Sequence, residues 1–159
     1  MESRKIALYG IIAALYVVLT VAVAPLAYGQ LQFRLSELLV PLIMFDFGFA
    51  WPLLIGTAIA NFFSPLGMTD VVFGTLGTAV GIFSFMAAKK VLPSAKFWQQ
   101  VVYFLIAFGV IGMFVIAVEL NLVYAIPLTE AWITVMLGQI AVLILGVFII
   151  KKLYPRLKK

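Results

Sequence analysis

Residues 98–118, WQQVVYFLIAFGVIGMFVIAV, run for twenty-one positions without a charged side chain and end at Glu119. A helix needs about 20 apolar residues to cross a bilayer, so this stretch alone predicts a membrane span. The whole chain follows the same pattern, because it is 65% hydrophobic and only 11% charged. Soluble domains are about 45–50% apolar and about 25% charged. We therefore predict a polytopic all-α membrane protein.

Five further segments are apolar enough to enter or cross the membrane. They are residues 6–28, a short segment that begins within the polar patch 29–37 and ends near Asp46, and residues 49–63, 70–88 and 131–150. The first is too long for a typical signal-peptide core, and no small-residue cleavage site closes it, so we expect a permanent helix. The sequence thus predicts a compact bundle of six transmembrane helices that forms a single domain over residues 1–159.

The basic residues gather on one side of the membrane when six spans are counted. Ten of the 11 Lys and Arg residues then lie together, and Arg34 alone lies on the other side. The ten are Arg4, Lys5, Lys89, Lys90, Lys96, Lys151, Lys152, Arg156, Lys158 and Lys159. Because Lys and Arg are enriched in cytoplasmic loops, we expect both termini to be cytoplasmic. This use of the basic residues also explains the net charge of +5 without a nucleic-acid partner.

The other side of the predicted bundle is acidic. It carries Arg34, Glu37, Asp70, Glu119 and Glu130. Ionisable groups in or near spans are costly, usually face the bundle interior and are functional candidates. With Asn61 and nearby aromatic residues such as Tyr28 and Phe33, they predict an outward-facing cavity with apolar walls and a few polar groups. An excess of carboxylates favours a cationic or donor-rich ligand, and a planar heterocycle fits this description.

Several of these residues also have structural explanations. Asp70 and Glu130 each open a predicted helix, where a carboxylate is favourable at the positive end of the dipole. Glu37 lies one helical turn after Arg34, so the two could form an ion pair within one helix. Glu119 has neither a capping position nor a local partner in the sequence, and we expect it to be functional.

Small residues that lie one helical turn apart form a second pattern, which indicates close packing between helices. The patterns Gly10-xxx-Ala14, Gly56-xxx-Ala60 and Gly77-xxx-Gly81 allow helices to approach closely. Internal packing is the simpler explanation, and contact with a helix of another protein is the alternative. The first segment also carries Ala7, so one face of it is nearly smooth.

The composition excludes much chemistry. The chain has no Cys and no His, which removes thiol nucleophiles, imidazole bases and most metal sites, so we expect no metal and no cofactor. It also has no G-x-x-x-x-G-K-[ST] loop, and on the predicted outer face no Lys accompanies its few Ser residues. These features favour a transport protein without its own ATPase over an enzyme. A small proton-coupled exporter that uses Glu119 remains an alternative.

Three strings of residues resemble one known family. Residues 32–37 (QFRLSE), 61–67 (NFFSPLG) and 70–74 (DVVFG) resemble the QueT family, as do residues 11–20 (IIAALYVVLT) and the pair Glu119-Leu120. The resemblance covers most of the chain. QueT proteins are substrate-binding S components of energy-coupling factor transporters and are associated with queuosine precursors.

The resemblance implies a six-helix protein of the bacterial cytoplasmic membrane that captures a vitamin-like solute from outside. Such an S component docks on a transmembrane coupling subunit that carries two cytoplasmic ATPases. The small-residue face of the first helix is the usual docking surface, here Ala7, Gly10 and Ala14. The implied substrate is a 7-deazaguanine base, 7-aminomethyl-7-deazaguanine above others, and an S component for another vitamin is the alternative.

The expected substrate site combines polar and aromatic residues. Glu37, Asp70, Glu119 and Gln139 are the expected polar ligands, Arg34 and Asn61 orient them, and Tyr28 and Phe33 supply aromatic surface. One position departs from the family pattern, because Gly138-Gln139 stands where Gly-Glu is expected. A glutamine can hydrogen-bond a base but cannot pair with an ammonium group.

Overall fold

The computed structural model describes residues 2–28 and 33–157, and the regular elements among them are all helical. In chain order they are α1 (Glu2–Ala22), α2 (Ala24–Ala27), η1 (Leu35–Leu39), α3 (Leu42–Phe45), η2 (Phe47–Phe49), α4 (Ala50–Asn61), α5 (Met68–Val91), α6 (Phe97–Leu105), η3 (Ile106–Gly112), α7 (Met113–Tyr124) and α8 (Leu128–Leu157). The elements η1 and η2 are 3-10 helices, and η3 is a π-helix inside the continuous helical segment α6–η3–α7.

Four helical segments are long and apolar enough to cross a membrane. They are Ser3–Ala22, Met68–Val91, Phe97–Tyr124 and Leu128–Leu157, and two shorter apolar segments, Leu35–Phe45 and Phe47–Asn61, lie between the first and the second. The predicted fold class, a polytopic all-α membrane protein, is confirmed. The second and third predicted segments are shorter than the roughly 20 residues that a perpendicular helix needs.

Local chemistry explains why the second segment is short and irregular. Pro41 separates η1 from α3, because proline has no N–H with which to continue a helical ladder. At the other end, the Asp46 carboxylate accepts a hydrogen bond of 2.8 Å from the Gly48 N–H, which caps η2 and reverses the chain. The predicted end near Asp46 is therefore confirmed.

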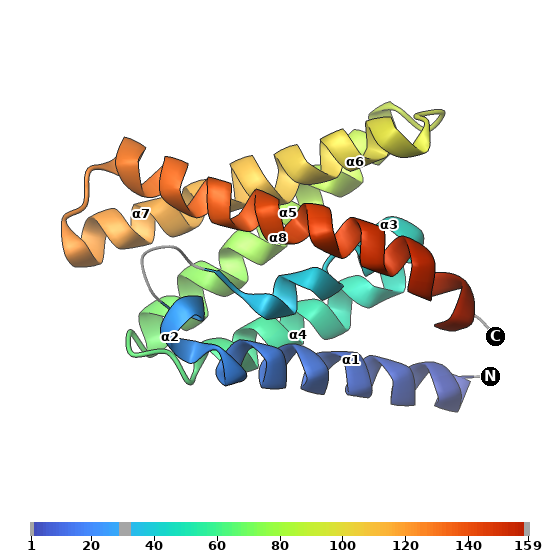
Figure 1. The fold of residues 1–159 in the computed structure, drawn as a ribbon, viewed down its shortest axis with the longest axis horizontal. Coiled ribbons are helices and arrows are strands. Elements are labelled where there is room, and N and C mark those ends of the chain that lie inside the picture. Colours follow the sequence, from blue (N-terminus) through green and yellow to red (C-terminus); the bar gives the residue numbers. More distant parts are fainter. Residues whose placement is uncertain (1, 29–32, 158–159) are drawn as a thin grey trace.

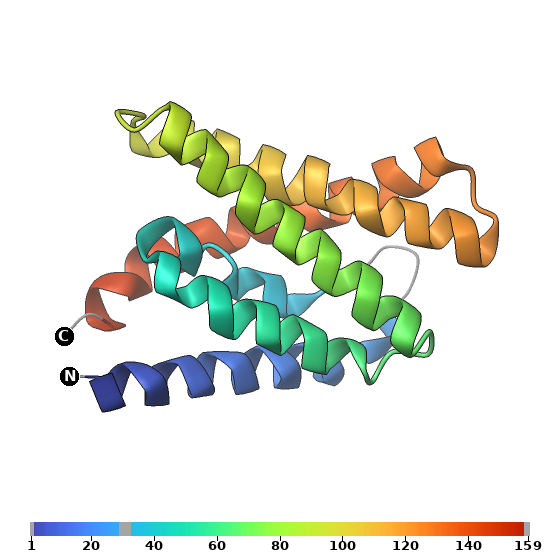
Figure 2. The same cartoon turned by 180° about the vertical axis from the view of Figure 1, so that it is seen from behind.

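Both termini lie at the same end of the bundle (Figure 1). The α5–α6 connection lies at this end too, whereas α5 begins at the opposite end, where the α7–α8 connection also lies (Figure 2). Lys89 and Lys90, in the last turn of α5, are thus brought to the end that holds the termini. The predicted gathering of basic residues agrees with this arrangement, and the cytoplasmic orientation of that end stays a prediction.

The interior is aromatic and aliphatic, and the outside is apolar as well. Tyr16, Phe85 and Phe104 are the largest side chains that are completely buried. On the outside, Trp51 is 70% exposed and Phe83 is 68% exposed. A protein that presents many such side chains on its outside requires a lipid environment.

The small-residue patterns have two different roles. A Cβ added at Gly56 would lie 3.0 Å from the Tyr16 Cβ, and one added at Gly77 would lie 3.0 Å from the Gly112 carbonyl oxygen. The patterns that contain Gly56 and Gly77 therefore serve internal packing. A Cβ added at Gly10 would meet no atom within 4 Å, and Gly10 is exposed. Ala7 and Ala14 are exposed as well, so this stripe of α1 faces outward.

We expect Gly77→Leu to destabilise the bundle, because α5 and η3 meet there backbone to backbone and neither can move aside. Overpacking a tight core lowers the free energy of unfolding by about 1–3 kcal/mol. Because the contact here is between backbones, we expect a loss at the upper end of this range. Thermal unfolding in detergent measures the effect, with Gly10→Leu as the matched control. Equal melting temperatures for the two variants would contradict the packing argument.

Candidate functional site

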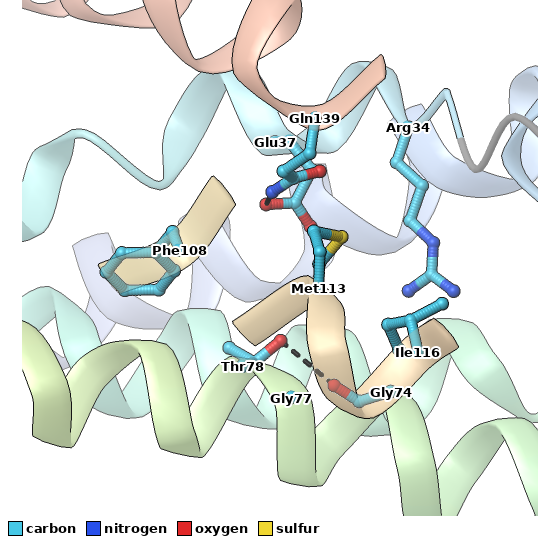
Figure 3. Close-up of a pocket in the computed structure, with 9 residues that line it drawn as sticks. All are labelled: Arg34, Glu37, Gly74, Gly77, Thr78, Phe108, Met113, Ile116 and Gln139. Carbon is cyan, nitrogen blue, oxygen red and sulfur yellow. Dashed lines mark hydrogen bonds between the residues drawn. The ribbon is translucent and has the colours of Figure 1, made fainter. Parts of the chain in front are cut away.

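A narrow internal cavity lies between η1, α5, α8 and the helical segment that contains η3 (Figure 3). It is lined by Arg34, Glu37, Gly74, Gly77, Thr78, Phe108, Met113, Ile116 and Gln139. The free volume, counted for the centre of a water molecule, is about 20 Å³. Roughly 10–15 Å³ by this measure accommodates one water molecule. In this conformation the cavity is therefore smaller than a nucleobase.

Glu37 joins three parts of the fold at one side of the cavity. The Tyr16 hydroxyl of α1 donates a hydrogen bond to Glu37 Oε1, and Gln139 Nε2 of α8 donates one of 2.8 Å to Glu37 Oε2. Close by, the Thr20 hydroxyl donates to Ser36 Oγ over 2.7 Å. Because each carboxylate oxygen of Glu37 already has a donor, Glu37 is held in a fixed position.

This arrangement gives the Gln139 side chain a defined role. The glutamine amide donates to Glu37, whereas a glutamate at the same position would place a second carboxylate there and would need a proton between the two. With its nitrogen directed at Glu37, the Gln139 side chain keeps its carbonyl oxygen as an acceptor for a ligand N–H.

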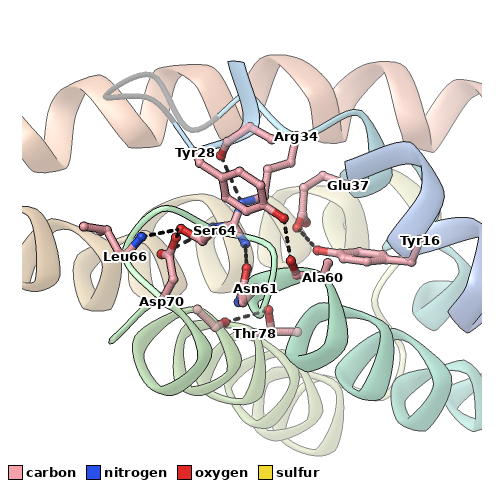
Figure 4. Close-up of polar contacts among 12 residues, drawn as sticks. Tyr16, Tyr28, Arg34, Glu37, Ala60, Asn61, Ser64, Leu66, Asp70 and Thr78 are labelled. Atoms are coloured by element: carbon pink, nitrogen blue, oxygen red, sulfur yellow. Dashed lines mark hydrogen bonds and ion pairs between the residues drawn. The ribbon is translucent and has the colours of Figure 1, made fainter. Parts of the chain in front are cut away.

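Arg34 lies at the centre of a second polar group (Figure 4). Its Nη1 donates a hydrogen bond of 3.0 Å to Asn61 Oδ1, and its Nη2 lies 3.9 Å from Asp70 Oδ1. Its guanidinium also lies 5.8 Å from the centre of the Tyr28 ring, which is close enough for a cation–π contact. Arg34 is only 6% exposed, so these contacts hold a charge in the interior.

The turn between α4 and α5 positions Asp70. Gly67 has φ +56°, a backbone conformation that suits glycine, and it allows α5 to start directly after the turn. The Ser64 hydroxyl donates to Asp70 Oδ2 and accepts a hydrogen bond of 3.1 Å from the Leu66 N–H. The NFFSPLG string, which forms this turn, therefore also anchors Asp70.

Glu119 is the buried carboxyl group of this region with no hydrogen bond to either oxygen among the described residues. It is completely buried, and neither of its oxygens has a hydrogen-bond partner among the described residues. The charged groups that act on it are Asp70 and Arg34. Asp70 Oδ1 and Asn61 Nδ2 also have no hydrogen-bond partner in the described part of the chain. Buried polar atoms are normally paired, so these unpaired atoms make this region a candidate site.

Asn121 and the predicted residues Glu130 and Phe33 prove more peripheral. Asn121 Nδ2 donates a hydrogen bond of 2.8 Å to the Ile126 carbonyl and so provides a partner for the backbone just after α7. Glu130 is exposed in the first turn of α8, where the dipole explains it. Phe33 is half-buried and does not line the cavity. Its backbone N–H donates a hydrogen bond of 3.0 Å to the Leu26 carbonyl.

Tyr28 supports the site from its rim. Its hydroxyl donates a hydrogen bond to the Ala60 carbonyl, at the end of α4 beside Asn61. Burial raises the pKa of the Tyr28 phenol, so this group remains a donor at ordinary pH. Tyr28 therefore fixes the backbone next to Asn61 and contacts Arg34 with its ring.

The sequence reasoning missed several residues of the site. Tyr16 and Ser64 hold the carboxylates of Glu37 and Asp70. Phe108 and Met113, in and just after the π-helix, line the cavity. Tyr16 and Thr20 stand one turn apart in an otherwise apolar helix, which is a detectable polar face, whereas nothing in the hydropathy distinguishes Phe108 from its neighbours.

Comparisons with known proteins agree with the resemblance stated above. The family model described as QueT transporter matches residues 6–155. The chain is 36% identical to the queuosine precursor transporter QueT of Lactococcus lactis subsp. cremoris (strain MG1363), over 98% of this chain and 95% of that protein. No solved structure matches the chain. Since both sequence matches cover nearly its whole length, the chain belongs to the QueT transporter family.

Proposed function

We propose that this protein is the membrane-embedded substrate-binding subunit of an ATP-driven importer of a queuosine precursor, 7-aminomethyl-7-deazaguanine. The observation that carries the proposal is the buried group of Asp70, Glu119 and Asn61 with unpaired polar atoms, next to a cavity lined by Arg34 and Glu37. The L. lactis relative is named as a transporter of queuosine precursors, which directs the proposal to this substrate class.

The chemistry of the substrate matches the groups that the site offers. A guanine-type edge presents two adjacent N–H donors, which carboxylate or amide oxygens can accept. The aminomethyl group is a cation, and a buried carboxylate is its natural partner. Glu119 offers two unpaired oxygens and Gln139 an amide oxygen, while Glu37 is already engaged by Tyr16 and Gln139. We therefore assign the ammonium group to Glu119 and the ring N–H groups to Gln139 and its surroundings.

Entry of the base requires the cavity to widen. A volume of about 20 Å³ for water centres is too small for a purine-like ring. Met113 and Ile116 line the cavity on α7, and methionine in particular is unbranched and adapts easily to a new neighbour. We propose that these side chains move aside when the base enters between α5 and α7.

The energy for uptake would come from partner subunits. The outward stripe of Ala7, Gly10 and Ala14 on α1 is smooth enough for another helix to approach closely. We assign this stripe to the transmembrane coupling subunit, which joins two cytoplasmic ATPases. The protein itself would capture the solute and present it.

The compound that copurifies with the protein tests the assignment of the substrate. We expect mass spectrometry of the purified protein to detect 7-aminomethyl-7-deazaguanine, and calorimetry to show its binding in preference to riboflavin and biotin. Tight binding of a different vitamin without binding of the deazaguanine would overturn the substrate and retain the S-component class.

Dependence on ATPases separates an importer from a proton-coupled exporter. We expect cells that express the protein with the coupling subunit and both ATPases to accumulate the labelled base. Cells with an ATPase pair inactivated in the phosphate-binding lysines should not accumulate it. Uptake that persists without ATP hydrolysis, or efflux driven by a proton gradient, would overturn the importer assignment.

A further inference from the structure

Phe108 brings an aromatic ring to the cavity (Figure 3). The other lining residues in the described part of the chain are not aromatic. Phe108 is 3% exposed, and its ring packs against that of Phe104 with the two centroids 4.9 Å apart. Phe104 is completely buried and does not line the cavity. The Phe108 ring is therefore supported by the core while it borders the free space of the site.

Glycine on α5 makes room for this ring. A Cβ added at Gly81 would lie 2.6 Å from Phe108 Cδ1 and 2.9 Å from Phe108 Cε1. The ring thus lies close to the α5 backbone, and a side chain at position 81 would displace it. One turn earlier, Gly77 lines the cavity and meets the Gly112 carbonyl oxygen in the same close manner. The Gly77-xxx-Gly81 pattern therefore fixes the position of Phe108 as well as the spacing of α5 and η3.

The π-helix η3 keeps Phe108 on the interior face of its helical segment. Buried residues recur at every fourth position of α6–η3–α7, namely Phe104, Phe108, Gly112, Ile116 and Leu120. Because an α-helix has 3.6 residues per turn, four such steps overshoot four turns by about 1.6 residues, almost half a turn. The wider turns of a π-helix take up this difference, so Phe108 and Leu120 share the interior face. Such π-helical turns are frequent at functional sites, which agrees with the place of η3 beside the cavity.

A hydrogen bond from α8 holds η3 in this conformation. The Trp132 indole N–H donates a hydrogen bond of 2.9 Å to the Val110 carbonyl in the middle of η3. The Trp132 ring also packs edge-on against Phe114, with the two centroids 5.3 Å apart. Two turns further along α8, Gln139 lines the same cavity. The ring of Phe108 and the amide of Gln139 are therefore presented by two elements that are fixed to each other.

We propose that Phe108 is the surface on which the ring system of the base stacks, and that this contact recognises the face of the ring. The inference rests on the proposed function, in which the hydrogen bonds assigned to Gln139 recognise only the edge of the base. Met113 and Ile116 are the walls that move aside, whereas Phe108 is held between Phe104 and the α5 backbone at Gly81. A planar base that enters the cavity comes to rest on the wall that cannot move, and stacking on an aromatic ring stabilises it there.

The ring current of Phe108 allows a direct measurement by nuclear magnetic resonance. The ring system of 7-aminomethyl-7-deazaguanine has a single carbon-bound proton, and a ¹³C label at that carbon makes it observable beside protein and detergent. We expect this proton to shift upfield when the base binds the wild-type protein, because the face of an aromatic ring shields a proton above it. Most of the shift should be lost with Phe108→Leu, which keeps an apolar side chain without a ring.

Calorimetry of two variants separates stacking from packing. Phe108→Leu should weaken binding of the base about tenfold, as expected for the loss of a base–aromatic contact. Phe85→Leu is the matched control, because Phe85 is completely buried against Phe104 and does not line the cavity. It should lower the melting temperature, and it should leave both the affinity and the upfield shift as in the wild-type protein.

The outcomes distinguish this inference from the proposed function. The inference is wrong, while the proposed function stands, if the wild-type protein binds the base without an upfield shift. The same conclusion follows if Phe108→Leu retains the shift, or if it and Phe85→Leu lose affinity equally. If Phe108→Leu does not fold, the direction of the shift in the wild-type protein decides. If the wild-type protein does not bind the base, the proposed function fails and the inference fails with it.

Discussion

Gly10→Leu is expected to reduce uptake by at least tenfold in cells that contain the complete transporter, without weakening substrate binding to the isolated subunit. The reason is geometric, because a Cβ added at Gly10 meets nothing within 4 Å in this protein, and Gly10 is exposed. A leucine there leaves the bundle undisturbed. It does prevent a second helix from lying against the stripe of Ala7, Gly10 and Ala14, where close approach depends on small residues.

Uptake of labelled base and calorimetry of the purified subunit measure the two halves of this prediction. Ala87→Leu is the matched control, since it adds the same side chain at an exposed alanine of α5. We expect it to support normal uptake. Full uptake by the Gly10→Leu protein would show that α1 does not use this face for a partner. Loss of binding in the isolated subunit would place the effect inside the bundle.

The sequence predicted the membrane fold because hydropathy is a local property. The composition of each long apolar run, such as residues 98–118, indicates that it lies in lipid, independently of the rest of the chain. The irregular elements were less predictable. The π-helix η3 keeps an unbroken apolar run, so its change of hydrogen-bonding pattern leaves no trace in hydropathy, and residues 35–45 combine polar and apolar positions with Pro41. The packing of the helices against one another decides the conformation of both η3 and residues 35–45.

The candidate site was predictable in its charges and unpredictable in its pairings. Scarce carboxylates in an apolar chain are conspicuous, and Glu37, Asp70 and Glu119 were all identified in this way. Their partners were not, because Gln139 meets Glu37 across 102 positions and Arg34 meets Asn61 across 27. The ion pair between Arg34 and Glu37, which was an alternative explanation, follows from helical spacing alone. In the structure, the Glu37 carboxylate receives hydrogen bonds from other helices.

These pairings explain why Glu119, rather than Glu37, is the carboxylate to test. Glu37 is engaged by Tyr16 and Gln139, so its removal would disturb the contact between α1, η1 and α8 as well as any ligand. Glu119 contributes no hydrogen bond to the fold in the described part of the chain, and a glutamine of the same shape leaves the packing of α7 unchanged. An effect of Glu119→Gln on binding can therefore be attributed to the ligand.

Glu119→Gln is expected to weaken binding of 7-aminomethyl-7-deazaguanine about 100-fold and binding of its nitrile analogue less than threefold. Loss of one partner from a buried charge pair costs about 2–5 kcal/mol, and a factor of 100 corresponds to about 2.7 kcal/mol. The nitrile carries no charge, so for this base the substitution only exchanges a carboxylate for an amide as hydrogen-bond partner. Calorimetry of both bases, with Glu130→Gln as the control, gives the ratio of the two losses. Since the ring is common to both bases, an equal loss would mean that Glu119 contacts the ring or only shapes the cavity, and the ammonium group would then lie elsewhere.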